Sequence, residues 1–168
     1  MRPSKKSERG DADRREIVDE LNRLMAEEAE ACLRYFHMRF RLRERDYLVA
    51  EEFFQNAIAE TLEHATSIGA QIRALGHTPT LRIELSLTGG PMRLETALAE
   101  ALEVEQQALD AYKDFLPRVT GDPALEPFIS KQVTVETEHV DEIRQFVRSK
   151  SLVKVVSGSR EDSSSPTG

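Results

Sequence analysis

The chain has 168 residues, of which 39% are hydrophobic and 32% charged, enough apolar material for one domain with a well-solvated surface. Its formal net charge is −7, and an acidic chain is a poor nucleic-acid binder because phosphate groups would be repelled. No stretch approaches the roughly 18 apolar residues that a membrane span needs, and residues 1–15 lack the apolar core of a signal peptide. We therefore expect a cytoplasmic protein that binds neither nucleic acid nor membrane.

Four segments with helical periodicity lie between two polar ends. Apolar residues in these segments recur every three or four positions, which predicts amphipathic helices. The second segment ends at the helix-stop sequence Gly76-His77-Thr78-Pro79, and Asp122-Pro123 is a typical start for the fourth. The helices are expected at approximately 13–44, 48–75, 94–116 and 123–147. The polar ends predict flexible tails at 1–12 and 151–168 around one domain at 13–150.

The lengths of the connections predict how these helices are arranged. The first and second helices are joined by a few residues, as are the third and fourth, so each pair should be antiparallel. A long stretch, residues 77–93, separates the two pairs. The sequence therefore predicts an all-α fold, an antiparallel four-helix bundle with one long crossover between helices two and three.

Acids and histidines occur in phase with the apolar faces, where an unpaired charge would be costly. Glu28 lies seven residues before Tyr35, so both side chains point in nearly the same direction. Glu136 and His139 form a Glu-x-x-His pair on an apolar face of the fourth helix. His64 on the second helix and Glu103 on the third complete an ordered set, which fits the ligand pattern of di-iron bundles.

These motifs resemble those of bacterioferritin and the wider ferritin-like di-iron carboxylate family. The resemblance covers approximately residues 20–145 and includes Ala101-Leu102-Glu103 and Glu136-Thr137-Glu138-His139. It implies a ferroxidase centre that holds two iron ions per subunit and oxidises Fe²⁺ with oxygen or peroxide, with iron storage in a homo-oligomer. Glu28 and Glu103 would be terminal ligands, Glu136 would bridge, His64 and His139 would each bind one iron, and Tyr35 would lie beside the centre.

The chain departs from the family pattern at three places. Thr61 stands where a second bridging glutamate is expected; the adjacent Glu60 could replace it if a π-bulge turned it inward. Leu62 stands where the family has its haem-ligating methionine, so no haem is predicted. The family's short fifth helix is hard to find after Val147, which puts the closed cage in doubt.

Other interpretations remain open at this stage. With Thr61 in place of a bridging acid, the bundle could bind metal or serve as a structural protein without oxidising iron. Manganese or zinc would suit many of the same ligands. A peroxide reductase resembling rubrerythrin is disfavoured because the single cysteine, Cys32, cannot build that family's cysteine-bound iron module.

Overall fold

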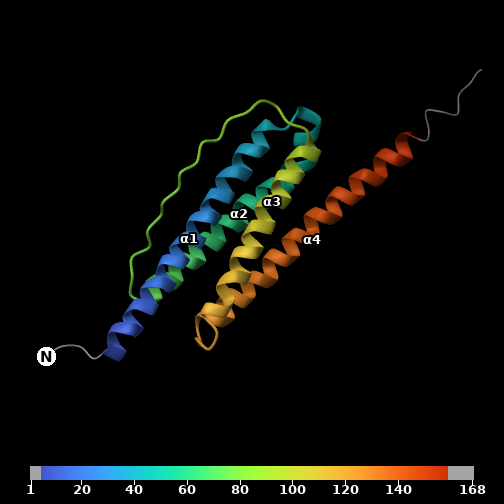
Figure 1. Ribbon diagram of the computed structural model, residues 1–168. Helices are drawn as coiled ribbons and strands as arrows, with labels where there is room; N and C mark the ends of the chain where they lie inside the picture. The colour runs from blue at the N-terminus through green and yellow to red at the C-terminus, as the bar shows by residue number, and fades with distance from the viewer. Residues whose placement is uncertain (1–4, 159–168) are drawn as a thin grey trace, which may run out of the picture.

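The computed structural model describes residues 5–158, which form a bundle of four long helices (Figure 1). The helices are α1 (Lys5–Arg41), α2 (Glu44–Ala74), α3 (Leu94–Phe115) and α4 (Leu125–Gly158), with a short 3₁₀ turn, η1 (Leu116–Arg118), after α3. Within the described range the only β-type pairing is an isolated bridge between Leu42 and Met92. The prediction of an all-α four-helix bundle is confirmed.

The first and last helices of the chain, α1 and α4, are longer than the sequence predicts. α1 begins at Lys5 and α4 continues to Gly158, so parts of both predicted tails are helical. Extending an existing helix adds one hydrogen bond per residue fixed, and the costly nucleation step has already been taken. Residues 1–4 and 159–168, which complete the predicted tails, lie outside the described residues.

The start of α4 is set by Asp122. Its Oδ1 accepts hydrogen bonds from the backbone N–H groups of Ala124 at 2.9 Å and Leu125 at 2.8 Å. A carboxylate that caps the free N–H groups of a first turn in this way stabilises the helix start. The Glu126 carboxylate reaches back to the Gly121 N–H at 2.6 Å, which fixes the turn that precedes α4.

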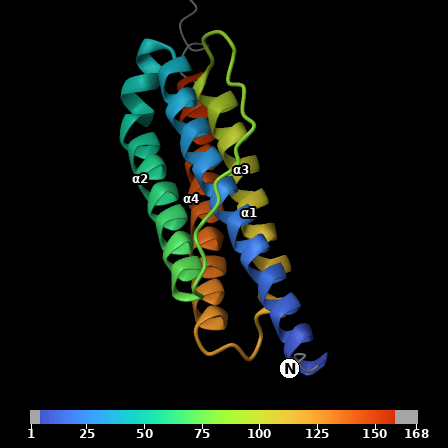
Figure 2. The same ribbon diagram turned by 90° about the vertical axis from the view of Figure 1, so that its left-hand side faces the viewer.

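The long crossover runs extended along the outside of the α1/α2 pair, as Figure 2 shows. It is tied to that pair at both ends. The Thr80 N–H donates to Asn22 Oδ1 at 2.6 Å, and the Met92 N–H donates to the Arg41 carbonyl at 2.7 Å. The Leu94 N–H, at the start of α3, donates to Asp46 at 3.0 Å. The crossover therefore delivers the chain back to the opposite end of the bundle, where the second helix pair begins.

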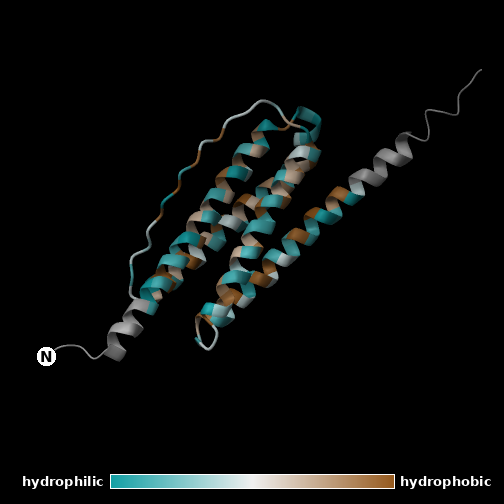
Figure 3. Cartoon of the chain, in the orientation of Figure 1, coloured by the Kyte–Doolittle hydropathy of each residue, from teal (hydrophilic) through white to brown (hydrophobic). Residues whose placement is uncertain are grey.

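Two apolar clusters fill the bundle, and the coloured parts of the helices carry both hydrophobic and hydrophilic residues (Figure 3). One cluster includes Tyr35, Phe54 and Leu98; the other includes Leu24, Ile68 and Ile129. Polar side chains are nevertheless buried in the described part of the bundle: Glu28, Thr61, His64, Glu105, Gln132 and Glu136. Such a concentration of buried charge requires internal partners or a bound cation.

No helix in the described part of the chain has the length and hydropathy needed to cross a membrane.

Candidate metal centre

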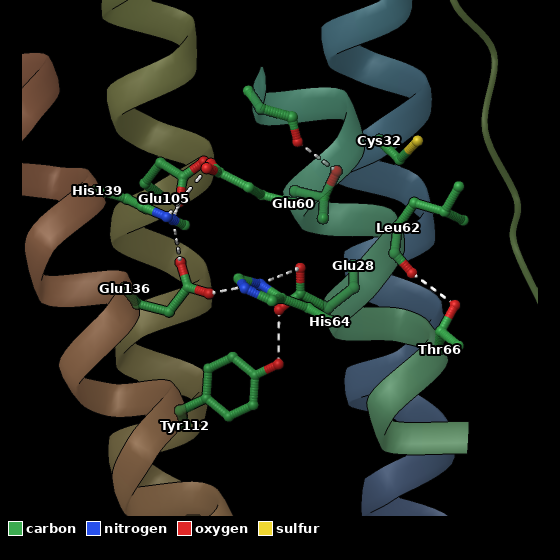
Figure 4. A network of polar contacts seen from close by, with 12 residues as sticks. Glu28, Cys32, Glu60, Leu62, His64, Thr66, Glu105, Tyr112, Glu136 and His139 are labelled. Atoms are coloured by element: carbon green, nitrogen blue, oxygen red, sulfur yellow. Dashed lines mark hydrogen bonds and ion pairs between the residues drawn. The ribbon is translucent and has the colours of Figure 1, made fainter. Parts of the chain in front are cut away.

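Two overlapping groups of potential metal ligands meet inside the bundle (Figure 4). The His64 group contains Glu28, His64 and Glu136, and the His139 group contains Glu105, Glu136 and His139. Within each group one ligand atom per residue lies within 4.8 Å of the others. Glu136 belongs to both groups, so its two carboxylate oxygens can serve two ions at once.

All four helices contribute to these groups. Glu28 comes from α1, His64 from α2, Glu105 from α3, and Glu136 with His139 from α4. The last two are three residues apart, which places them one turn apart on the same helix face. The convergence is therefore a product of the tertiary fold, with each helix presenting its polar residue toward the same interior point.

Both imidazoles present Nδ1 to the carboxylates. His64 Nδ1 lies 3.0 Å from Glu136 Oε1 and 3.5 Å from Glu28 Oε2. His139 Nδ1 lies 3.3 Å from Glu105 Oε2 and 3.5 Å from Glu136 Oε2. The two rings are stacked, with centroids 5.7 Å apart and planes inclined by 14°. Each half of the centre thus pairs one imidazole nitrogen with oxygens from two carboxylates.

Two buried atoms at the middle of the centre lack a hydrogen-bond partner. They are His64 Nδ1 and Glu136 Oε1, which face each other without hydrogen-bond geometry. A buried polar group without a partner is costly, and native structures rarely retain one unless something else satisfies it. A nitrogen and an oxygen that converge in this way suit a cation that accepts both imidazole and carboxylate donors.

Two buried tyrosines hold the outer oxygens of the carboxylates. The Tyr112 hydroxyl donates to Glu28 Oε1 at 2.6 Å, and the Tyr35 hydroxyl donates to Glu105 Oε1. Burial, followed by the nearby carboxylates, raises the pKa of both phenols well above their ordinary value. Both hydroxyls therefore keep their protons at neutral pH and act as donors, which orients each carboxylate while leaving its other oxygen toward the centre.

The close packing of acids and imidazoles shifts their protonation equilibria. Burial alone would lower the pKa of each histidine, but the neighbouring carboxylates outweigh burial and raise the pKa to about 10 for His64 and about 11 for His139. Burial would raise the pKa of Glu136, but its contacts with both histidines dominate and hold the pKa at about 2. Burial raises the pKa of Glu105 to about 7. In the absence of a cation, protonated imidazoles supply the positive charge.

The structure brings together four of the predicted ligands, Glu28, His64, Glu136 and His139, with Tyr35 beside them. The placement of Glu103 on the buried face was wrong, because this side chain is exposed and Glu105 occupies the centre. The buried stripe of α3 passes through Ala101 and Leu109, four residues on either side of Glu105. Glu103 is two residues from Glu105, which turns it about 200° to the outside.

A sequence signal for Glu105 was available. Glu105 lies seven residues before Tyr112, which repeats the spacing of Glu28 and Tyr35 in α1. Each tyrosine bonds to the glutamate of the other helix, so the two pairs are interlocked across the bundle.

The structure does not turn Glu60 into the second bridging glutamate that is missing at Thr61. α2 is a regular α-helix across this region, so no π-bulge turns Glu60 inward. The half-exposed Glu60 belongs to neither ligand group, and its Oε2 lies 3.4 Å from His139 Nε2, the ring nitrogen opposite the one that faces the centre. Thr61 is buried, with its hydroxyl donating to the Ala57 carbonyl at 2.8 Å.

The family model of the ferritin-like domain matches residues 18–152. The chain belongs to the ferritin-like family. No curated protein matches its sequence. The matched residues include both ligand groups, from Glu28 to His139, so the centre lies inside the ferritin-like domain.

Solved structures share this fold at low sequence identity. A ferritin-like diiron-carboxylate protein from Bacillus anthracis is 22% identical, with a TM-score of 0.71 over 80% of this chain and 97% of the other. A dodecameric thioferritin from Bacteroides fragilis is 18% identical, with a TM-score of 0.75 over 85% and 90%. The Desulfovibrio desulfuricans bacterioferritin is 19% identical, with a TM-score of 0.73 over 82% and 81%. These likenesses establish the ferritin-like bundle.

Proposed function

We propose that the protein binds two iron ions at this centre and oxidises Fe²⁺ to Fe³⁺. The observation that carries the proposal is the convergence of His64 Nδ1 and Glu136 Oε1, buried atoms that make no hydrogen bond, inside two ligand groups that share one carboxylate. Glu28 and His64 would hold one ion, Glu105 and His139 the other, and Glu136 would contact both. The mixed carboxylate and imidazole donor set suits iron, and also manganese or zinc.

The protein's own residues have distinct tasks in this proposal. Three buried carboxylates supply negative charge in a region poor in water, where electrostatic interactions are strong. Tyr112 and Tyr35 keep their protons and hold Glu28 and Glu105 in position. Glu60 acts on the outer nitrogen of His139, in the manner of a carboxylate that fixes the orientation of a ligating imidazole.

The chemistry that the bound metal supplies is electron transfer to an external oxidant. Each Fe²⁺ gives one electron, so a pair of ions reduces one O₂ to H₂O₂, or one H₂O₂ to water, with two protons taken up. The bundle's part is to hold the ions together, exclude competing ligands and supply a fixed arrangement of charge. We assign Tyr35 and Tyr112 the same orienting task, one in each half of the centre.

Assembly with further copies, and storage of the oxidised iron, are extensions of this proposal. α1 exposes Leu33, Phe36 and Phe40, which lie at helical spacing and would gain from being covered by another copy. The related protein from Bacteroides fragilis is described as dodecameric.

A second candidate function is metal binding without iron oxidation. Thr61 favours it, because the centre offers one shared carboxylate, Glu136, and the side chain opposite cannot supply another. Both candidate functions use the same ligand groups. They differ in whether the bound Fe²⁺ is oxidised.

Anaerobic titration with Fe²⁺, followed by mixing with oxygenated buffer, tests both candidates. We expect two equivalents to bind and the ferric absorbance to rise faster than in a protein-free blank. The variant Glu136→Gln should lose both properties, while Glu138→Gln, an exposed acid two residues away on α4, should keep them. Tight binding with oxidation at the blank rate would support the second candidate, and no binding would refute both.

A further inference from the structure

The centre has an approximate two-fold internal symmetry that relates α1 and α2 to α3 and α4. Glu28 corresponds to Glu105, and His64 corresponds to His139, with their tyrosine partners exchanged between the helix pairs. Glu136 lies three residues before His139, and the equivalent position before His64 is Thr61. The symmetry is therefore broken at one place, where the counterpart of the shared carboxylate is missing.

Thr61 does not fill the position of that missing carboxylate. Its side chain is 4% exposed, and its hydroxyl is turned back to the Ala57 carbonyl along its own helix. This bond satisfies the hydroxyl locally, as is common for threonine within a helix. The side chain is also two heavy atoms shorter than glutamate, so space remains between α2 and the His139 half of the centre.

That space is a pocket, here called the Thr61 pocket, with a volume of about 200 Å³. A water molecule occupies about 30 Å³ of liquid volume, so the pocket has room for a molecule of several heavy atoms. It reaches the surface beside exposed acids and an amide, and it ends at buried groups of the centre. Its lining includes Asn56, Glu60, Thr61, Glu105, His139 and Glu142.

The charge of the filled centre indicates what the pocket would take. Two divalent cations carry a charge of +4, and ionised Glu28, Glu105 and Glu136 carry −3, with both imidazoles neutral when they bind metal. The remainder is +1 in a largely buried region, where an uncompensated charge is costly. A single external anion would restore neutrality, and a carboxylate would reproduce what the symmetry lacks.

We propose that the Thr61 pocket binds a small external carboxylate, of the size of formate or acetate, beside the His139 half of the centre, where a carboxylate at residue 61 would lie. This inference rests on the proposed metal centre. Exposed Glu60 and Glu142 at the pocket mouth disfavour anions, but solvent and salt screen their charges, whereas the cations lie inside. The carboxylate should therefore bind only to the metal-loaded protein.

The test uses Co²⁺ as a spectroscopic substitute for iron and sodium acetate as the ligand. The cobalt-loaded full chain should show a saturable change in its visible absorption as acetate is added, with sodium perchlorate at equal ionic strength causing none. The metal-free protein should bind no acetate in calorimetry. Because binding equilibria are reciprocal, saturating acetate should raise the apparent Co²⁺ affinity by about tenfold.

Two substitutions on α2 provide a matched comparison. Thr61→Glu adds an internal carboxylate and should weaken the acetate response at least tenfold. Thr66→Glu adds the same group at an exposed position whose hydroxyl also bonds to a carbonyl four residues back, and it should retain the response. Thr61→Glu should still bind Co²⁺ in the same titration, which shows that a lost acetate response is not a folding defect.

The possible failures are distinguishable. If Co²⁺ does not bind, the proposed metal centre and this inference both fail. If Co²⁺ binds but acetate changes nothing, the inference alone is overturned. A response that appears only in Glu60→Gln would also overturn it, because Glu60 would then already occupy the pocket. An equal response in Thr61→Glu and the unaltered protein would place acetate elsewhere.

Discussion

Glu105 and Glu103 lie two residues apart on α3, and we expect their replacement by glutamine to affect metal binding differently. Glu105→Gln should weaken binding, and Glu103→Gln should leave it almost unchanged. Glu105 is 4% exposed, and its Oε2 lies 3.3 Å from His139 Nδ1, whereas Glu103 is exposed. Glutamine has nearly the same shape as glutamate, so each substitution removes one charge and disturbs the packing little. The pair therefore isolates the contribution of charge at the centre.

The size of the effect follows from the position of the charge. Two unit charges 4 Å apart interact by about 4 kcal/mol at an effective dielectric constant of 20. The amide oxygen of glutamine retains part of that attraction. We expect Glu105→Gln to weaken the ion beside His139 by roughly 3 kcal/mol, about 100-fold in dissociation constant. An exposed charge is screened by solvent and salt, so Glu103→Gln should change the metal affinity by less than about twofold.

Anaerobic calorimetry with Co²⁺ measures both variants, with thermal unfolding of the metal-free proteins as the check on folding. The unaltered chain should bind two equivalents of Co²⁺. In Glu105→Gln the ion beside His139 should bind more weakly, and the ion beside His64 should bind as before. Equal weakening in the two variants, or two unchanged sites in Glu105→Gln, would refute the assignment of Glu105.

Three further predictions concern a cap, a tyrosine and the core. Asp122→Ala should cost about 1 kcal/mol in urea unfolding at pH 7, and Asp122→Asn should lose only the smaller part that depends on charge. Backbone N–H donors lower the pKa of Asp122, so that charge-dependent part should disappear as acid protonates the carboxylate below 3.8. Tyr112→Phe should weaken metal binding beside Glu28 about tenfold in calorimetry. Ile68→Ala should cost about 2–5 kcal/mol in unfolding, because this side chain is fully buried.

Much of the fold could be predicted from local signals. Helical periodicity located the four helices, and the long stretch at 77–93 set their connectivity. The helix ends were less predictable: polar residues after Lys5 and the β-branched residues near Val156 join existing helices, because continuing a helix costs little once it has formed.

The candidate site was readable where a polar residue stood in phase with apolar neighbours. Glu136 and His139 met that condition, and so did Glu28. The prediction of Glu103 followed its motif, Ala101-Leu102-Glu103, although the phase of α3 points to Glu105. The nitrogen that each histidine presents, and the pocket beside Thr61, depend on how separate helices pack, which periodicity does not contain.

The division of the ligands between the two helix hairpins has a consequence for folding. The α1/α2 hairpin supplies Glu28 and His64, the α3/α4 hairpin supplies the remaining three ligands, and one extended strap joins them. A cation shared through Glu136 would act as a non-covalent cross-link between the halves. A chain cut within residues 77–93 should then stay assembled when loaded and come apart more readily in a chelator, since ligand binding to the native state alone raises its stability.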